Sequence, residues 1–368
     1  MAPEPGIGDI VAGYRLDSVV ARGGMGTIYR ATHERLGTTF ALKVLRPELA
    51  SDPQFRSRFE LEARLLAQFH HPNVVQVTNA GEDAGILYMV TTYLEGYALT
   101  DLILRAGRLD PALVLDYVSQ IASALDAAHE SGLVHRDVKP SNILITSASA
   151  SDPGGKAYLV DFGIAKDVAN AGKLTEYGAF VGSRHYASPE QINARPLDGR
   201  ADQYSLACVF FEAVTGHVPY DRGSEAAVIV AHLTEAPPSL AADRPDLPAA
   251  LDKALAKALS KDPAERYPTC AAMVEALEQA AGASGEASSA ELAELAPGVI
   301  TAAGKTEVGA GREPPIELPP DMPPPIPAGH ETEVGIAQGG PPPQETPDSP
   351  AGGDSGGTEV VSRGTPPV

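Results

Sequence analysis

A run of polar residues at 135–142, His-Arg-Asp-Val-Lys-Pro-Ser-Asn, has side-chain types and spacing that could do chemistry. The run follows an amphipathic helical pattern and precedes a short apolar stretch. A carboxylate (Asp137), a lysine two residues later (Lys139) and an amide five residues later (Asn142) form an unusual polar cluster between two apolar elements. We therefore treat this cluster as a candidate reaction centre.

A second carboxylate, Asp161, follows the apolar residues 158–160 and precedes Phe162 and Gly163. A carboxylate at a strand end suits a Mg²⁺ ligand, because Mg²⁺ prefers a few oxygen ligands together with phosphate. Taken alone, Asp161 is more simply interpreted as a turn residue.

Lys43 lies on a strand predicted at 39–44, where it shares a face with Ala41. A small residue beside a cation suits a flat base packed next to a phosphate group, although a solvated edge-strand lysine has the same pattern. A helix predicted at 53–68 places Glu62 on an apolar stripe, whereas Glu60 is expected to face water. Because an unpaired buried carboxylate costs roughly several kcal/mol, we expect Glu62 to pair with Lys43.

A glycine cluster, Ala-Arg-Gly-Gly-Met-Gly at 21–26, lies between two predicted strands. Three glycines in four residues remove Cβ atoms where backbone N–H groups could approach phosphates. Alone, the cluster is also typical of a tight turn.

The elements that must position these residues change in type along the chain. Alternating apolar residues between 14 and 44 predict an antiparallel sheet, with Tyr14, Leu16, Ser18 and Val20 on one face. Strands before helices favour a small β-rich lobe on a larger helical lobe, with a ligand site in the cleft between them. Later helices are predicted at 112–129, 201–215, 249–260 and 269–280.

The composition excludes several classes of protein. With 48 acidic and 28 basic side chains, the net charge is −20, which disfavours nonspecific binding to nucleic acid or anionic lipid. Two cysteines, Cys208 and Cys270, cannot build a disulfide scaffold and favour a cytoplasmic location. No secretory signal or membrane-spanning run is visible, and the apolar stretch 204–214 predicts a buried core helix.

The composition changes near residue 280, after which Pro, Gly, Ala, Ser and Glu dominate and aromatic residues vanish. Such a segment cannot bury enough surface to offset its chain entropy, so we predict disorder. Within it, Thr-Glu-Val recurs at Thr306, Thr332 and Thr358, about 26 residues apart. We expect these threonines to be phosphorylated and to dock phosphothreonine-binding partners such as forkhead-associated domains; the alternative is a repeat without a ligand.

Together these features resemble the signature set of the protein kinase family, and Gly-Gly-Met-Gly resembles the bacterial eukaryotic-like (Hanks-type) serine/threonine kinases. The order is glycine-rich loop, strand lysine, helix glutamate, His-Arg-Asp loop, Asp-Phe-Gly and then Ser-Pro-Glu at 188–190. Asp202, Arg266 and the segment at 261–267 also match the sequence pattern of the family. The resemblance covers about residues 14–278.

The resemblance implies an α+β, two-lobed protein-kinase fold with a disordered tail. The expected parts are an N-terminal lead at 1–13, a kinase domain at 14–278 and a tail at 279–368. Within the domain, the β-rich N-lobe covers 14–92 and the helical C-lobe covers 93–278.

Residue roles follow from the same resemblance. Asp137 would accept the proton of the substrate hydroxyl, Lys139 would steady the γ-phosphate of ATP, and Asn142 and Asp161 would hold Mg²⁺, with Mn²⁺ as an alternative ion. Lys139 at this position is typical of kinases that act on Ser and Thr. Thr91 aligns with the gatekeeper position. The expected ATP-binding residues are Val20, Ala21, Arg22, Gly23, Gly24, Met25, Gly26, Ile28, Ala41, Lys43, Glu62, Thr92, Leu94 and Leu144.

Three further residues carry an expected regulatory role. In the family, the residue at Arg136 binds a phosphate on the activation loop, which spans 161–190 here. We rank Thr175 first as the phosphorylated residue, and Ser183 matches the hydroxyl that touches Asp137. The alternative is a loop that is ordered without phosphate.

One departure from the family pattern concerns Ala21, which replaces the first glycine of the glycine-rich loop. If that position needed a positive φ, alanine would cost about 1 kcal/mol or more.

Two other function classes remain open. One is a catalytically weak scaffold with a kinase fold, which is disfavoured because Lys43, Asp137, Asn142 and Asp161 are all present. The other is a small-molecule phosphotransferase, a class that generally lacks the Ser-Pro-Glu and Arg266 elements.

Overall fold

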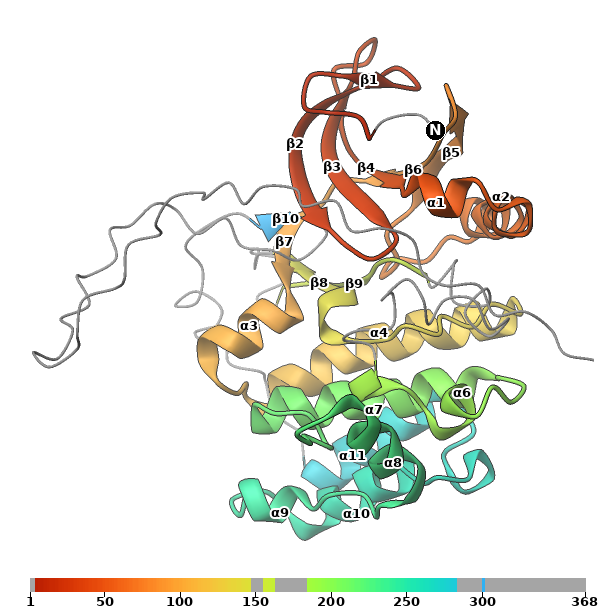
Figure 1. Cartoon of the computed structure of the whole chain (residues 1–368). Coiled ribbons are helices and arrows are strands. Elements are labelled where there is room, and N and C mark those ends of the chain that lie inside the picture. Colours follow the sequence, from red (N-terminus) through yellow and green to blue (C-terminus); the bar gives the residue numbers. More distant parts are fainter. Residues whose placement is uncertain (1–3, 147–154, 163–183, 283–299, 302–368) are drawn as a thin grey trace, which may run out of the picture. The chain divides into compact units, whose positions relative to one another are not determined.

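The computed structural model describes residues 4–146, 155–162, 184–282 and 300–301. Strands come first and helices later, as Figure 1 shows, and the expected two-lobed α+β arrangement is confirmed. No helix among these described residues is long and apolar enough to cross a membrane.

The N-lobe is built on an antiparallel sheet of six strands in the order β1-β2-β3-β4-β6-β5. Its two faces bury different sets of side chains, as alternation along a strand requires. On β4, Leu42 and Val44 enter one cluster with Tyr29 and Val90, while Lys43 points to the other face. The strands are β1 (Ile10–Val11), β2 (Tyr14–Arg22), β3 (Gly26–His33), β4 (Thr39–Leu45), β5 (Val77–Asp83) and β6 (Ile86–Thr92).

Strand β2 departs from the strict alternation that the sequence predicts. Its pairing with β3 shifts register between Leu16 and Ser18 and again between Val19 and Ala21. Such bulges rotate the side chains that follow. Val20 is nevertheless buried, whereas Ser18 is only half-buried.

Two helices cover the second face of the sheet, α1 (Pro47–Ala50) and α2 (Pro53–Gln68). Helix α2 has the predicted bounds. It begins where the Asp52 carboxylate accepts from the backbone N–H of Gln54 at 2.8 Å and where Pro53 occupies the first turn. Its buried stripe packs on β5 and β6, and Glu60 is exposed as expected.

The C-lobe packs around helix α7 (Gly199–Thr215), in which nearly every residue from Ala201 to Val214 is buried. The core helix expected from the sequence is therefore present. Helices α4 (Pro111–Glu130), α10 (Ala249–Ala258) and α11 (Cys270–Ala281) contact it and lie within two residues of their predicted bounds. Elements that the sequence did not predict are α3 (Leu99–Ala106), α6 (Pro189–Ile192), α8 (Glu225–Thr234) and α9 (Leu240–Asp243).

A small second sheet, in the order β10-β7-β8-β9, lies beside the junction of the lobes. Strand β8 (Ile143–Thr146) follows the polar run at 135–142, and strand β9 (Ala157–Leu159) precedes Asp161, as the sequence indicates. The other two strands are β7 (Glu95–Ala98) and β10 (Ile300–Thr301).

A buried ion pair ties the C-lobe together far along the chain. The Arg266 guanidinium donates to both carboxylate oxygens of Glu190, at 2.7 and 2.8 Å, and also to the carbonyls of Ser260 and Arg200. This arrangement satisfies a charge that would otherwise be costly to bury. Two of the motif residues that matched the kinase pattern therefore form one contact.

Packed residues extend past both ends of the expected kinase domain, whose bounds stay a prediction. Before residue 14, residues 4–13 pack and hydrogen-bond on the N-lobe sheet. Helix α11 continues to Ala281, three residues past 278, and Gly282 ends it with φ +67°. Ile300–Thr301, within the segment predicted to be disordered, pair with Glu95 and Gly96 of β7.

Candidate functional site: the cavity beside Lys43 and the loop at 135–142

An ion pair crosses from the N-lobe sheet to the end of β9. Lys43 Nζ lies 2.9 Å from Asp161 Oδ2, and both side chains are partly exposed. Asp161 has a positive φ of +55°, a conformation that aspartate tolerates better than most residues. Glu62 is half-buried on α2, and its predicted pairing with Lys43 stays a prediction.

An apolar cavity opens next to this ion pair. Its walls come from β3, β4, β6 and the residues around β9, and they include Ile28, Ala41, Lys43, Thr91 and Asp161. Two of the expected ATP-binding residues, Ile28 and Ala41, therefore line one cavity with the ion pair. Another, Leu144, is buried against Val75 and Val160, which also line this cavity, and Leu94 packs on the same cluster.

Thr92, another expected ATP-binding residue, ends β6, and its backbone N–H donates to Gln76 O at 3.0 Å. This N–H therefore already has a partner within the protein. Val20 is buried on β2 and is not among the residues that line the described cavity.

The glycine-rich loop at 21–26 joins β2 to β3. Gly26 is required by close approach, because a Cβ there would lie 1.9 Å from Val44 O. Ala21 lies on β2, pairs with Ile28 and is not among the residues with positive φ. The substitution of glycine by Ala21 therefore carries no backbone strain.

A buried carboxylate holds the first residues of the polar run at 135–142, which we call the catalytic loop. Asp202 on α7 is fully buried and accepts from the backbone N–H groups of His135 and Arg136, both at 2.7 Å. Arg136 has φ +64°, a strained conformation that the two hydrogen bonds help to maintain. From α6, Gln191 Nε2 donates to Arg136 O at 2.9 Å.

The polar cluster itself is assembled as one hydrogen-bonded unit. Lys139 Nζ donates to Asp137 Oδ2 at 3.0 Å, and Asn142 Nδ2 donates to both the carbonyl and the carboxylate of Asp137. Asn142 is buried, and its backbone carbonyl accepts from Val160 N–H at 3.0 Å. Asn142 and Asp161 are thus brought together through Val160, with the Asn142 side-chain nitrogen turned to Asp137.

The residue after Asp161 connects the two lobes. The Phe162 ring lies 4.6 Å from the His135 ring and 6.1 Å from that of Phe69, at the end of α2, measured between centroids. It packs against the apolar clusters of both lobes. A shift of α2 would therefore displace Phe162 and, through this ring, His135 of the catalytic loop.

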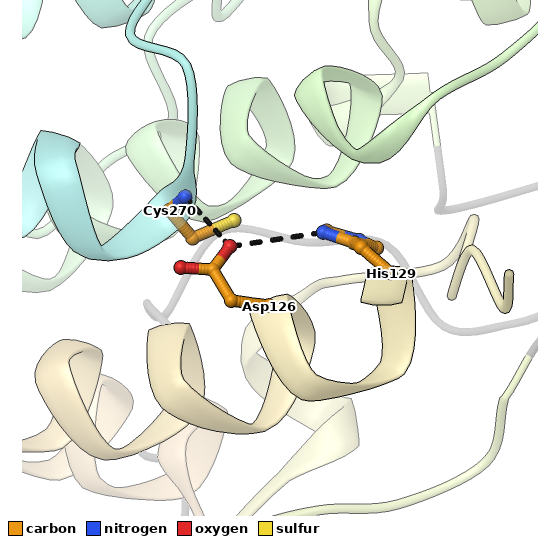
Figure 2. Close-up of side chains that lie close together, drawn as sticks. All are labelled: Asp126, His129 and Cys270. Carbon is orange, nitrogen blue, oxygen red and sulfur yellow. Dashed lines mark hydrogen bonds and ion pairs between the residues drawn. The ribbon is translucent and has the colours of Figure 1, made fainter. Parts of the chain in front are cut away.

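A second group of titratable side chains lies behind the catalytic loop, where Figure 2 shows Asp126, His129 and Cys270. His129 Nε2 lies 2.8 Å from Asp202, and its Nδ1 lies 3.8 Å from Asp126. Both carboxylate oxygens of Asp126 accept from the first backbone N–H groups of α11, at 2.8 Å. Because these oxygens and His129 Nε2 already have partners, we assign the group to charge pairing and not to a metal.

Burial alone would lower the pKa of His129, but the hydrogen bonds and charges of Asp126 and Asp202 outweigh it and raise the pKa to about 9. The imidazolium therefore compensates the buried charge of Asp202. The ring also packs on Gly199, where a Cβ would lie 2.3 Å from Nδ1.

Sequence reasoning missed His129, Gln191 and the arginine Arg46, whose Nη2 donates to Gly23 O at 3.0 Å. A spacing of three between Asp126 and His129 on a helix was the one available signal. Thr175 and Ser183 lie outside the described residues, and so do Thr306, Thr332 and Thr358.

We predict that His129 makes stability depend on pH. A pKa raised from 6.5 to about 9 stabilises the folded state fully below pH 6.5, and this contribution is lost as pH rises through 9. The difference in unfolding free energy between wild type and His129→Gln, measured in urea, should shrink by roughly 2 to 3 kcal/mol between pH 6 and 10.

Subtracting the variant removes the effect of other groups that titrate here, such as Lys261, whose pKa burial lowers to about 8. His217→Gln is the matched control, because His217 forms an exposed pair with Asp243. A difference that stays constant over this pH range would contradict the assignment of a charged His129.

Comparisons with known proteins agree with this geometry. The family profile of the protein kinase domain matches residues 14–277. The serine/threonine-protein kinase PknJ of Mycobacterium tuberculosis is 40% identical over 269 residues, which are 73% of this chain and 45% of PknJ. PknE of the same organism is 42% identical over 257 residues, 70% of this chain and 44% of PknE.

Among solved structures, the PknI kinase domain of M. tuberculosis superposes with a TM-score of 0.61 at 34% identity, covering 75% of this chain and all of that domain. The chain spans less than half the length of PknJ and PknE. The matched profile, these relatives and the cavity beside the Lys43–Asp161 ion pair place this chain in the protein kinase family, among relatives that are bacterial serine/threonine kinases of the Hanks type.

Proposed function

We propose that this chain transfers the γ-phosphoryl group of ATP to Ser and Thr hydroxyls of proteins and also phosphorylates itself. The observation that carries the proposal is the hydrogen-bonded unit of Asp137, Lys139 and Asn142, joined through Val160 to Asp161 and the Lys43 ion pair. These are the groups that phosphoryl transfer needs for positioning and charge neutralisation.

Each of these residues has a proposed task that its surroundings support. Lys43 binds the α- and β-phosphates from the cavity wall, and the backbone of the glycine-rich loop covers them. Asp137 accepts the proton of the substrate hydroxyl, and Lys139, already bound to Asp137, steadies the transferred phosphoryl group. The base lies in the cavity lined by Ile28 and Ala41.

The family implies ATP and a divalent cation, and we propose Mg²⁺ with Mn²⁺ as the alternative. Two oxygen donors fit this ion, the Asn142 amide oxygen and the Asp161 carboxylate, together with phosphate oxygens. When bound, the ion neutralises charge on the phosphates. Lys139 favours Ser and Thr over Tyr as acceptors.

Regulation is proposed to act through Arg136 and the activation loop. The strained backbone of Arg136, held by Asp202 and Gln191, fixes where its guanidinium can meet a phosphate. We propose phosphorylated Thr175 as that partner, with Ser183 contacting Asp137. Both residues lie outside the described part of the chain, so the proposal rests on their position in the sequence.

The repeated threonines of the tail, Thr306, Thr332 and Thr358, are proposed as phosphorylated docking sites for phosphothreonine-binding proteins such as those with forkhead-associated domains. Their shared Thr-Glu-Val context supports this role. A reducing, cytoplasmic setting is proposed from the two free cysteines, both buried in the C-lobe.

Labelled ATP tests the activity directly. Wild type incubated with Mg²⁺ and a generic basic protein should label that protein on Ser and Thr, and Asp137→Asn should lower kcat by about 100-fold or more. Asp221→Asn, an exposed aspartate of the C-lobe, is the matched control and should remain active. Absence of transfer by wild type, with Mg²⁺ or Mn²⁺, would favour the scaffold, and label found only on small molecules would favour the other phosphotransferase class.

Phosphopeptide mapping tests the regulatory and docking proposals. Phosphate is expected on Thr175 and on at least one tail threonine, and Thr175→Ala should lose most activity and its sensitivity to phosphatase. A triple Thr306, Thr332 and Thr358 to Ala variant should keep kinase activity but no longer retain a forkhead-associated domain in a pull-down. Full activity of Thr175→Ala would refute the first proposal, and unmodified tail threonines in cells and in vitro would refute the second.

A further inference from the structure

The segment before β1 lies against the two strands that carry the glycine-rich loop. The buried Tyr29 hydroxyl donates to Pro5 O at 2.7 Å. Two backbone hydrogen bonds, Gly8 N–H to Leu16 O and Leu16 N–H to Asp9 O, fix the segment to β2 at 2.8 and 2.9 Å. Glu4 is therefore held at a defined place beside the loop.

The Glu4 carboxylate bridges the two ends of the glycine-rich loop. Its Oε1 accepts from Thr27 Oγ1 at 2.5 Å and from Arg22 Nη1 at 3.1 Å. Arg22 and Thr27 are paired across β2 and β3, so they close the loop that Gly23 to Gly26 form. One carboxylate thus links both strands at the point where the loop begins and ends.

Glu4 touches the face of the sheet that points away from the nucleotide cavity. Ile28 and Lys43 are paired residues that line the cavity, whereas their neighbours Thr27 and Val44 line a separate hollow together with Glu4. Because successive side chains alternate between faces, a contact at Thr27 cannot reach the nucleotide directly. Any effect on the nucleotide must pass through the backbone of the loop.

A second residue holds the same loop from this hollow. Arg46 donates from Nη2 to Gly23 O and from its backbone N–H to Met25 O, both at 3.0 Å. Glu4 and Arg46 therefore restrain the loop at its ends and along its length. Backbone amides that already lie in the binding geometry lose less entropy when they bind phosphates.

We propose that Glu4 is a positioning residue for the nucleotide, which fixes the glycine-rich loop over the phosphates through Thr27 and Arg22. The proposal rests on the proposed ATP-dependent function. The Arg22 contact is exposed and contributes little, while the hydroxyl of Thr27 is buried and its bond to a charged acceptor contributes more. Loss of Glu4 should loosen the loop and weaken nucleotide binding without altering the catalytic loop.

The test measures Mg-ATP binding by titration calorimetry and steady-state kinetics for Glu4→Gln, Thr27→Val and the double variant. Glu4→Gln and Thr27→Val should each raise Kd and KM for ATP about three- to tenfold. The double variant should be no worse than the poorer single one, because both changes act on the same hydrogen bond, which Glu4→Gln weakens and Thr27→Val removes. The kcat should stay within about twofold, and amide exchange at Gly23 to Met25 should become faster.

Two control variants separate this role from general stability. Thr27→Ser keeps the hydroxyl and should restore binding, and Glu34→Gln changes an exposed acidic residue of the same lobe and should have no effect. Unchanged Kd and unchanged amide exchange in Glu4→Gln would overturn the inference, as would a lower Tm with unchanged Kd. A wild-type chain that binds no Mg-ATP would instead refute the proposed function and, with it, this role.

Discussion

The buried carboxylate of Asp202 is the contact on which the candidate active site depends. It accepts two backbone hydrogen bonds from the catalytic loop and one from the side chain of His129. A carboxylate without solvent must be fully paired, and these partners satisfy it. In return, it holds Arg136 in a left-handed conformation that directs Asp137 towards Lys139 and Asn142.

From this anchor, a series of contacts reaches the N-lobe. Asn142 binds the backbone of Val160, β9 pairs with the segment around Val75, and Phe162 packs between His135 and Phe69. Lys43 then meets Asp161 from the other lobe. The proposed nucleotide-binding groups and the candidate reaction centre are thus parts of one connected arrangement, which explains why residues so far apart in the sequence form one motif set.

Much of the fold could be predicted because local signals were strong. The apolar stripe defined α2, and the apolar run around Tyr204 defined the buried α7. The candidate site residues come from the family resemblance, and their roles stay predictions. The bulges in β2 and the absence of backbone strain at Ala21 could not be predicted, because both depend on how β2 pairs with β3.

Other features depend on contacts between distant segments. In the sequence, His129 is one polar residue of an amphipathic helix. Its partner Asp202 lies on α7 and comes beside it only in the folded structure. The inferred role of Glu4 depends on the folded structure, in which the first residues of the chain lie beside Arg22 and Thr27. Strand β7 and helix α3 were missed because both are short and follow β6 and each other with few residues between them.

The most direct test of this account is Asp202→Asn, measured by kcat together with Mg-ATP affinity. The variant keeps the size of the side chain but removes the charge and one acceptor. The account predicts a fall in kcat of about 100-fold with Kd for Mg-ATP within about twofold of wild type, because the catalytic loop is displaced and the nucleotide cavity is not. An unchanged kcat, or an equal loss of nucleotide affinity, would contradict the central role of this carboxylate.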